Sequence, residues 1–220
     1  CSGRTNKLAK TYHSGKSEDL IPVLESIDKK YQEIYLIGFS IGGNIVLKYL
    51  GEIEKDIEPR IKKALVVSPP INLESSAIAL AQPEAKIYMN HLLKNLERKV
   101  KEKASIFPEE VCVNNFCEIK NFYDYDTRYT ASLNCFDSAK DYWQKASSEK
   151  FLEFINIPTT ILSSYDDPFL GPECFPEVKN PLVQTNYTQT GGHLGFMTFN
   201  WKKFDFECLQ EKIAVKEFKS

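Results

Sequence analysis

Residues 36–44, LIGFSIGGN, place a serine between glycines at the end of an apolar run. Gly38, Ser40 and Gly42 match the pattern G-x-S-x-G, in which a sharp strand-to-helix turn holds a serine in strained backbone angles. Small flanking residues, here extended by Gly43, let neighbouring backbone segments pass closely. The turn also places Ser40 at a helix N-terminus, where free N–H groups favour negative charge. We therefore predict a nucleophile elbow with Gly38, Gly42 and Gly43 as its small residues.

The composition is that of an ordinary globular domain. The chain has 220 residues, of which 42% are hydrophobic and 26% charged, and its net charge is −2. This balance favours neither nucleic acid nor an anionic membrane surface as a partner. No run approaches the ~20 apolar residues of a transmembrane helix. Since the chain starts at Cys1 without methionine or a signal-peptide pattern, we expect its start to be cut rather than native.

The cysteines and histidines predict neither a metal site nor a cofactor site. Six cysteines occur without a C-x-x-C pair, and three histidines occur without H-x-x-x-H spacing. The dispersed spacing predicts free thiols in a reducing compartment, and hence a cytoplasmic protein. A Cys112–Cys117 disulfide and a lipidated Cys1 are the alternatives.

Apolar runs and amphipathic segments alternate along the chain, which predicts an α/β fold with a parallel sheet. Ser17 or Asp19 is expected to cap the first helix. The expected helices cover 17–31, 43–53 and 201–218. Buried strands are expected over 33–39 and 60–70, and further strands over 157–168 and 181–193.

Residues 72–150 interrupt this alternation with a mostly helical stretch that is rich in loops. Helical spacing predicts one apolar stripe along Met89, Leu92, Leu93, Leu96 and Val100, and a further helix is expected over 137–147.

A serine nucleophile needs a base, and the three histidines differ in their suitability. His13 precedes the first helix, where a capping or surface role is expected. His91 lies within a helix beside the apolar stripe. His193 ends the last expected strand, in GGHLGF, and it alone fits the chain order serine, acid, histidine on a loop. We therefore predict His193 as the general base.

The acid is expected on a loop between Ser40 and His193. Asp167 follows TTILSSY, in the acidic loop that ends the strand expected over 157–168, and directly precedes Pro168, so it is the predicted acid. Asp166 is its neighbour and a candidate cap of the loop. The rival carboxylates Asp124 and Asp126 lie in the helical stretch, where a solvated face or a salt bridge to Arg128 is expected.

These motifs together resemble the YheT-like branch of the α/β-hydrolase superfamily, also called family 4. The resemblance rests on YHSG and SEDL near the start, the elbow GFSIGGN, YDYDTRYT and SAKDYWQKAS in the helical stretch, and the loops DDPFL and GGHLGF. It implies one partial α/β-hydrolase domain over 1–220. The core would be 1–71 and 151–220, a mostly parallel sheet flanked by helices, and 72–150 would be a cap-like insertion.

The resemblance also implies a serine hydrolase that cleaves carboxylic esters, with acylglycerols or other lipid esters as candidates, through an acyl-enzyme. Ser40, Asp167 and His193 would form the triad, and the Ile41 N–H would be one oxyanion donor. Five aromatic residues of the insertion are expected either to line an acyl pocket or to form the core of the cap: Phe116, Phe122, Tyr123, Tyr125 and Tyr129.

The chain departs from the family at its start. Four strands normally precede the strand that leads to the serine, so we expect the first strands and one oxyanion donor to be missing. The chain is then either a fragment of a longer enzyme, which we favour, or one that a separate chain completes. Two alternative functions stay open: an impaired remnant or binding module of the same fold, and an acyltransferase or thioesterase with the same triad.

Overall fold

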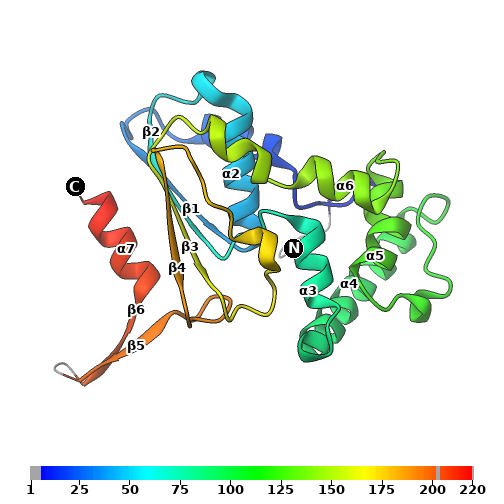
Figure 1. Ribbon diagram of the computed structural model, residues 1–220. Helices are drawn as coiled ribbons and strands as arrows, with labels where there is room; N and C mark the ends of the chain where they lie inside the picture. The colour runs from blue at the N-terminus through cyan, green and yellow to red at the C-terminus, as the bar shows by residue number, and fades with distance from the viewer. Residues whose placement is uncertain (1–5, 202–203, 220) are drawn as a thin grey trace.

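A four-stranded parallel sheet forms the centre of the protein, whose computed structural model describes residues 6–201 and 204–219 (Figure 1). Its strands, in spatial order, are β1 (Ile34–Phe39), β2 (Ile61–Val67), β3 (Thr159–Ser164) and β4 (Val183–Thr188). Every neighbouring pair runs parallel. The four predicted strands and the predicted α/β class are confirmed.

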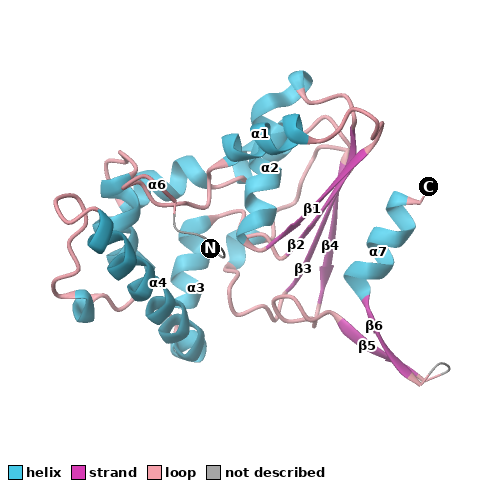
Figure 2. Ribbon diagram, turned by 180° about the vertical axis from the view of Figure 1, so that it is seen from behind, coloured by secondary structure: helices cyan, strands magenta, loops and turns pink. Residues whose placement is uncertain are grey.

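Helices cover both faces of this sheet (Figure 2). Helices α1 (Leu20–Ser26) and α2 (Ile41–Ile53) lie on one face, and α7 (Leu209–Phe218) lies on the other. Side chains alternate along β2, so Ala64 and Val66 join the core under α2 while Leu65 and Val67 join the core under α7. The sheet is therefore the middle layer of three.

Strand β1 lies at the edge of the described sheet and is only partly covered. Ile37 and Phe39 are 46% and 47% exposed. The helix α7 packs against Leu65 and Val67 of β2 and Leu162 of β3, so it leaves this part of β1 open. The prediction of a fully buried strand here was wrong, because burial depends on which helix covers the strand.

Residues 72–150 fold into helices beside one end of the sheet (Figure 1). The elements are α3 (Leu73–Leu80), α4 (Lys86–Ile106), α5 (Phe122–Tyr125), a π-helical turn (Asp126–Ala131) and α6 (Ala139–Ala146). On α4, Met89, Leu93 and Val100 are buried as the stripe predicted. That this segment acts as a cap stays a prediction.

The first predicted helix is shorter than expected. A 3-10 turn (Ser17–Asp19) leads into α1, which ends at Ser26, and neither Ser17 nor Asp19 makes a capping hydrogen bond through its side chain. The Ser17 hydroxyl instead donates to Glu52 Oε2 of α2 at 2.5 Å. The predicted cap was wrong because the hydroxyl serves a tertiary contact.

The predicted closing helix is correct only in its second half. Strands β5 (Met197–Asn200) and β6 (Asp205–Cys208) form an antiparallel hairpin before α7 begins. Phe199 and Phe206 face each other across it, with ring centroids 5.2 Å apart. Such cross-strand aromatic pairs stabilise a hairpin that helical periodicity does not reveal. Residues 202–203, part of the predicted helix, lie outside the described residues.

The cysteines in the described residues, Cys112, Cys117, Cys135, Cys174 and Cys208, are free thiols, so Cys112 and Cys117 form no bridge. Cys1 and its suggested lipidation lie outside the described residues. Within 6–201 and 204–219, no group of three or more histidine, cysteine or acidic side chains is placed to hold a metal. None of the helices in these ranges combines the length and apolar character needed to cross a membrane.

Asn44, in the first turns of α2, joins three separate segments through its side chain. It is fully buried. Its Nδ2 donates to Ser14 O at 2.8 Å and to Ala146 O at 2.9 Å, and its Oδ1 accepts from Ser148 N at 2.9 Å. The amide thereby ties the N-terminal segment and the end of α6 to the helix behind Ser40.

We expect Asn44→Ala to lower the free energy of unfolding by roughly 3–5 kcal/mol, because three buried or half-buried backbone groups lose their partner. Urea denaturation followed by circular dichroism measures the change. The exposed amide of Asn156, which bonds only to nearby Phe154 O, is the matched control, and Asn156→Ala should cost under ~0.5 kcal/mol. Equal losses in the two variants would contradict the role given to Asn44.

Candidate active site

Ser40 sits in a strained turn between β1 and α2. Its backbone angles are φ 50° and ψ −124°, a conformation that side-chain-bearing residues rarely adopt. The Ser40 N–H donates to Val67 O of the adjoining strand at 2.8 Å, which anchors the turn to the sheet. The predicted strand–turn–helix geometry is present, and the strain is that of a nucleophile elbow.

Close backbone packing requires two of the three elbow glycines. A Cβ on Gly38 would lie 2.7 Å from Gly43 Cα, and a Cβ on Gly43 would lie 3.0 Å from Pro69 Cβ. A Cβ on Gly42, by contrast, would meet no atom of the described residues within 4 Å. The described chain thus gives no steric reason for a glycine at position 42.

The structure brings the three predicted triad residues together. His193 Nε2 lies 2.9 Å from Ser40 Oγ, and His193 Nδ1 lies 2.7 Å from Asp167 Oδ2. Asp167 is 4% exposed, and its other oxygen accepts from Phe169 N at 2.8 Å. The Phe169 ring stacks on the imidazole with centroids 4.2 Å apart. Serine, histidine and carboxylate therefore form a continuous hydrogen-bonded relay.

Asp166 joins the acid loop to the histidine loop. Its Oδ1 accepts from Gly191 N at 3.0 Å, from Gly192 N at 2.8 Å and from the Ser164 hydroxyl at 2.5 Å. These hydrogen bonds, that from Ser164 first, hold the pKa of Asp166 below its usual range. The sequence suggested that Asp166 caps its own loop. In the structure its carboxylate also binds the backbone N–H groups of the loop that carries His193.

Ile41 is the first residue of α2 and lines the cavity beside Ser40. The first N–H groups of a helix have no acceptor within the helix. The Ile41 N–H is one of these groups, and its role as an oxyanion donor stays a prediction.

The two other histidines lie elsewhere. His13 Nδ1 accepts from Gly15 N at 3.2 Å, and the ring packs edge-on against Phe136. Burial, with nearby Lys16, lowers the pKa of His13. His91 is exposed on α4, where its Nε2 lies 3.0 Å from Asn95 Nδ2. His91 fits its expected place on a helix flank, whereas His13 is half-buried and caps no helix, so the capping or surface role expected of it was wrong.

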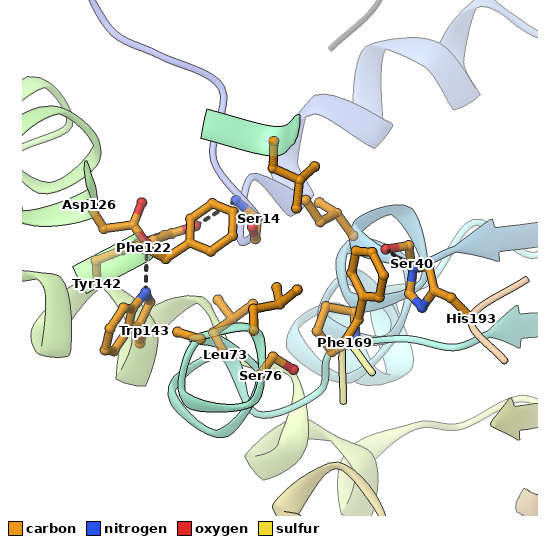
Figure 3. Close-up of a pocket in the computed structure, with 15 residues that line it drawn as sticks. Ser14, Ser40, Leu73, Ser76, Phe122, Asp126, Tyr142, Trp143, Phe169 and His193 are labelled. Atoms are coloured by element: carbon orange, nitrogen blue, oxygen red, sulfur yellow. Dashed lines mark hydrogen bonds between the residues drawn. The ribbon is translucent and has the colours of Figure 1, made fainter. Parts of the chain in front are cut away.

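A cavity of about 160 Å³ opens beside Ser40 and His193 and extends toward the 72–150 segment (Figure 3). Leu73, Leu80 and Phe122 form apolar parts of its wall. Of the five aromatic residues considered above, only Phe122 lines it. Phe116, Tyr125 and Tyr129 belong to a buried core around α4, and Tyr123 is 51% exposed.

Asp126 also lines this cavity, and the expectation for it was wrong. It is 7% exposed rather than solvated. Arg128 donates to backbone carbonyls of Asn114 and Asn115 instead of pairing with it. Asp126 accepts from Thr130 Oγ1 at 2.6 Å and from Trp143 Nε1 at 2.7 Å. The sequence holds no signal for this burial, because the indole partner is 17 residues away.

Comparison with family profiles found no match to the chain. Individual proteins do match. Over 203 residues the chain is 28% identical to YheT of Escherichia coli, an assumed esterase, and this covers 90% of the chain and 59% of YheT. Over 196 residues it is 30% identical to a monoacylglycerol lipase of Saccharomyces cerevisiae, covering 84% of the chain and 43% of the lipase. The chain thus spans about half the length of these relatives.

A solved structure shares the fold. The esterase EaEST of Exiguobacterium antarcticum superposes with a TM-score of 0.50 at 20% identity, over 99% of this chain and 78% of that one. The shared fold and the parallel sheet between helices show that the chain has an α/β-hydrolase fold, and its sequence is similar to those of YheT and the yeast lipase.

Proposed function

We propose that this chain carries the catalytic machinery of a serine hydrolase that cleaves carboxylic esters. The observation that carries the proposal is the relay from Ser40 Oγ through the His193 imidazole to the buried Asp167 carboxylate, at 2.9 and 2.7 Å. The elbow strain at Ser40 supports it, since such strain persists at catalytic turns. The names of the relatives, an assumed esterase and a monoacylglycerol lipase, support esters as the substrate class, with acylglycerols among them.

The chemistry follows from the positions of the atoms. His193 Nε2 removes the Ser40 proton while Oγ attacks the ester carbonyl, and Asp167 holds the imidazole in the required tautomer. The Ile41 N–H donates to the oxyanion as it forms. Protonated His193 then gives its proton to the leaving alcohol. Water, activated by His193, hydrolyses the acyl-enzyme and restores Ser40.

The proposal assigns different roles to the two parts of the chain. Residues 1–71 and 151–220 would carry the triad, and the 72–150 insertion would close over the substrate as a cap. A cytoplasmic location stays a prediction. Transfer of the acyl group to an alcohol, or cleavage of a thioester, would use the same relay and is distinguished by supplying those substrates.

We expect a fluorophosphonate probe to label the purified, folded chain at Ser40, because the relay makes Oγ nucleophilic. Labelling, read by mass spectrometry of the tryptic peptide, should disappear in Ser40→Ala. Ser132→Ala changes an exposed hydroxyl and should label as the wild type does. A folded chain that stays unlabelled would fit the remnant or binding module and would overturn the hydrolase proposal for this chain.

Asp167→Asn should lower kcat for a short-chain p-nitrophenyl ester by about 10³–10⁴-fold with little change in KM, because the imidazole loses its orienting carboxylate. Steady-state kinetics measure the two constants separately. Asp56→Asn, on the exposed turn Glu54–Asp56, should leave both unchanged. A similar fall in kcat for the two variants, or none for Asp167→Asn, would remove Asp167 from the mechanism.

A further inference from the structure

Asp126 faces the cavity from the end opposite Ser40. In Figure 3 Asp126, Phe122, Tyr142 and Trp143 lie at one end of the cavity, and Ser40 and His193 lie at the other. The carboxylate belongs to the π-helical turn Asp126–Ala131. Such turns are rare and frequently occur at functional sites.

Each oxygen of the Asp126 carboxylate can accept a further hydrogen bond. Oδ1 accepts from the Thr130 hydroxyl and Oδ2 from the Trp143 indole, one bond each. An ionised carboxylate offers about four lone-pair sites. A ligand in the cavity can therefore donate to Asp126 without breaking either existing bond.

The Asp126 carboxylate has no cationic partner in the described part of the chain. Among the residues that the structure describes, no lysine, arginine or histidine forms an ion pair with it. Burial raises the pKa of Asp126 to about 6, still below neutral pH, and the hydrogen bonds from Thr130 and Trp143 oppose this rise. A buried charge is costly unless it is paired, so a ligand that covers this end should itself supply the compensating charge.

The surrounding side chains suit a small organic cation. Phe122, Tyr142 and Trp143 line the same end, and aromatic rings attract ammonium groups. The cavity, about 160 Å³, is close to one that holds benzene, so a short arm of about six heavy atoms fits. A neutral hydroxyl would leave the charge uncompensated, and an anion would be repelled.

We propose that Asp126 is a specificity-determining residue, which selects a substrate arm that is short and ends in an ammonium group. That the bound arm belongs to an ester substrate rests on the function proposed for Ser40. Binding of the cation itself does not involve Ser40. A purely structural Asp126, which holds Thr130 and Trp143 in place, would show no preference among ligands.

Trp143 provides a direct readout. The chain has two tryptophans, and Trp201, directly after β5, is 80% exposed, so Trp201→Phe leaves Trp143 as the sole tryptophan, which is excited selectively over tyrosine. Fluorescence of this variant is titrated with n-butylammonium, n-butanol and butyrate at pH 7.5. We expect n-butylammonium to bind at least ~10-fold more tightly than n-butanol, and butyrate not to bind, as one paired charge is worth about 1.4 kcal/mol or more here.

Asp126→Asn in the same background keeps a side-chain acceptor but removes the charge. The ammonium preference over n-butanol should fall to within about twofold, whereas Asp137→Asn, an exposed loop change in the same segment, should keep it. Equal binding of the amine and the alcohol, or a preference that survives Asp126→Asn, overturns the proposal.

If Asp126→Asn does not fold, the three-ligand comparison in the Trp201→Phe chain decides alone. Repeating it with Ser40→Ala added should change nothing, so a failed labelling of Ser40 and a failed cation preference remain distinct results.

Discussion

The close passage of β1 against the start of α2 is the constraint on which the rest of the site depends. A Cβ on Gly38 would lie 2.7 Å from Gly43 Cα, and a Cβ on Gly43 would lie 3.0 Å from Pro69 Cβ and 3.3 Å from Gly38 O. Between these two glycines, Ser40 has a φ of 50°. The turn raises Oγ above the sheet edge and leaves the first N–H groups of α2 facing the same space. The predicted nucleophile and the predicted oxyanion donor thus come from one turn, which the hydrogen bond from Ser40 N to Val67 O ties to β2.

The sheet delivers the other two members of the relay. Strands β3 and β4 run parallel to β1, so the loops after them emerge at the edge where Ser40 stands. Asp167 and His193 meet there, 26 residues apart in the chain. Asp166 fastens the two loops together through the glycine N–H groups next to His193. The relay is therefore held by backbone contacts as well as by its own hydrogen bonds.

One turn after Ser40, the buried side chain of Asn44 connects helix α2 to the 72–150 insertion. Its amide holds Ser14 and Ala146 against α2, and Tyr142, one turn earlier in α6, accepts from Ser14 N at 3.0 Å. This arrangement brings Trp143 and Asp126 to the far end of the cavity that begins at Ser40. The turn at Ser40 and the buried amide of Asn44 thereby place the elbow and the 72–150 insertion on opposite sides of one cavity.

The sequence by itself predicted the four strands of an α/β sheet, the strand–turn–helix geometry at Ser40, and Asp167 and His193 as the residues that meet it. These follow from local signals: apolar runs, glycine spacing and chain order. The structure joins the three side chains by hydrogen bonds, and their catalytic roles stay predictions. Only the tertiary structure decided the burial of Asp126, the role of Asn44, the exposure of Ile37 and Phe39 on β1 and the hairpin that replaced half of the last predicted helix. Each depends on a partner distant in the chain or on which element covers which face, and neither periodicity nor residue type records such contacts.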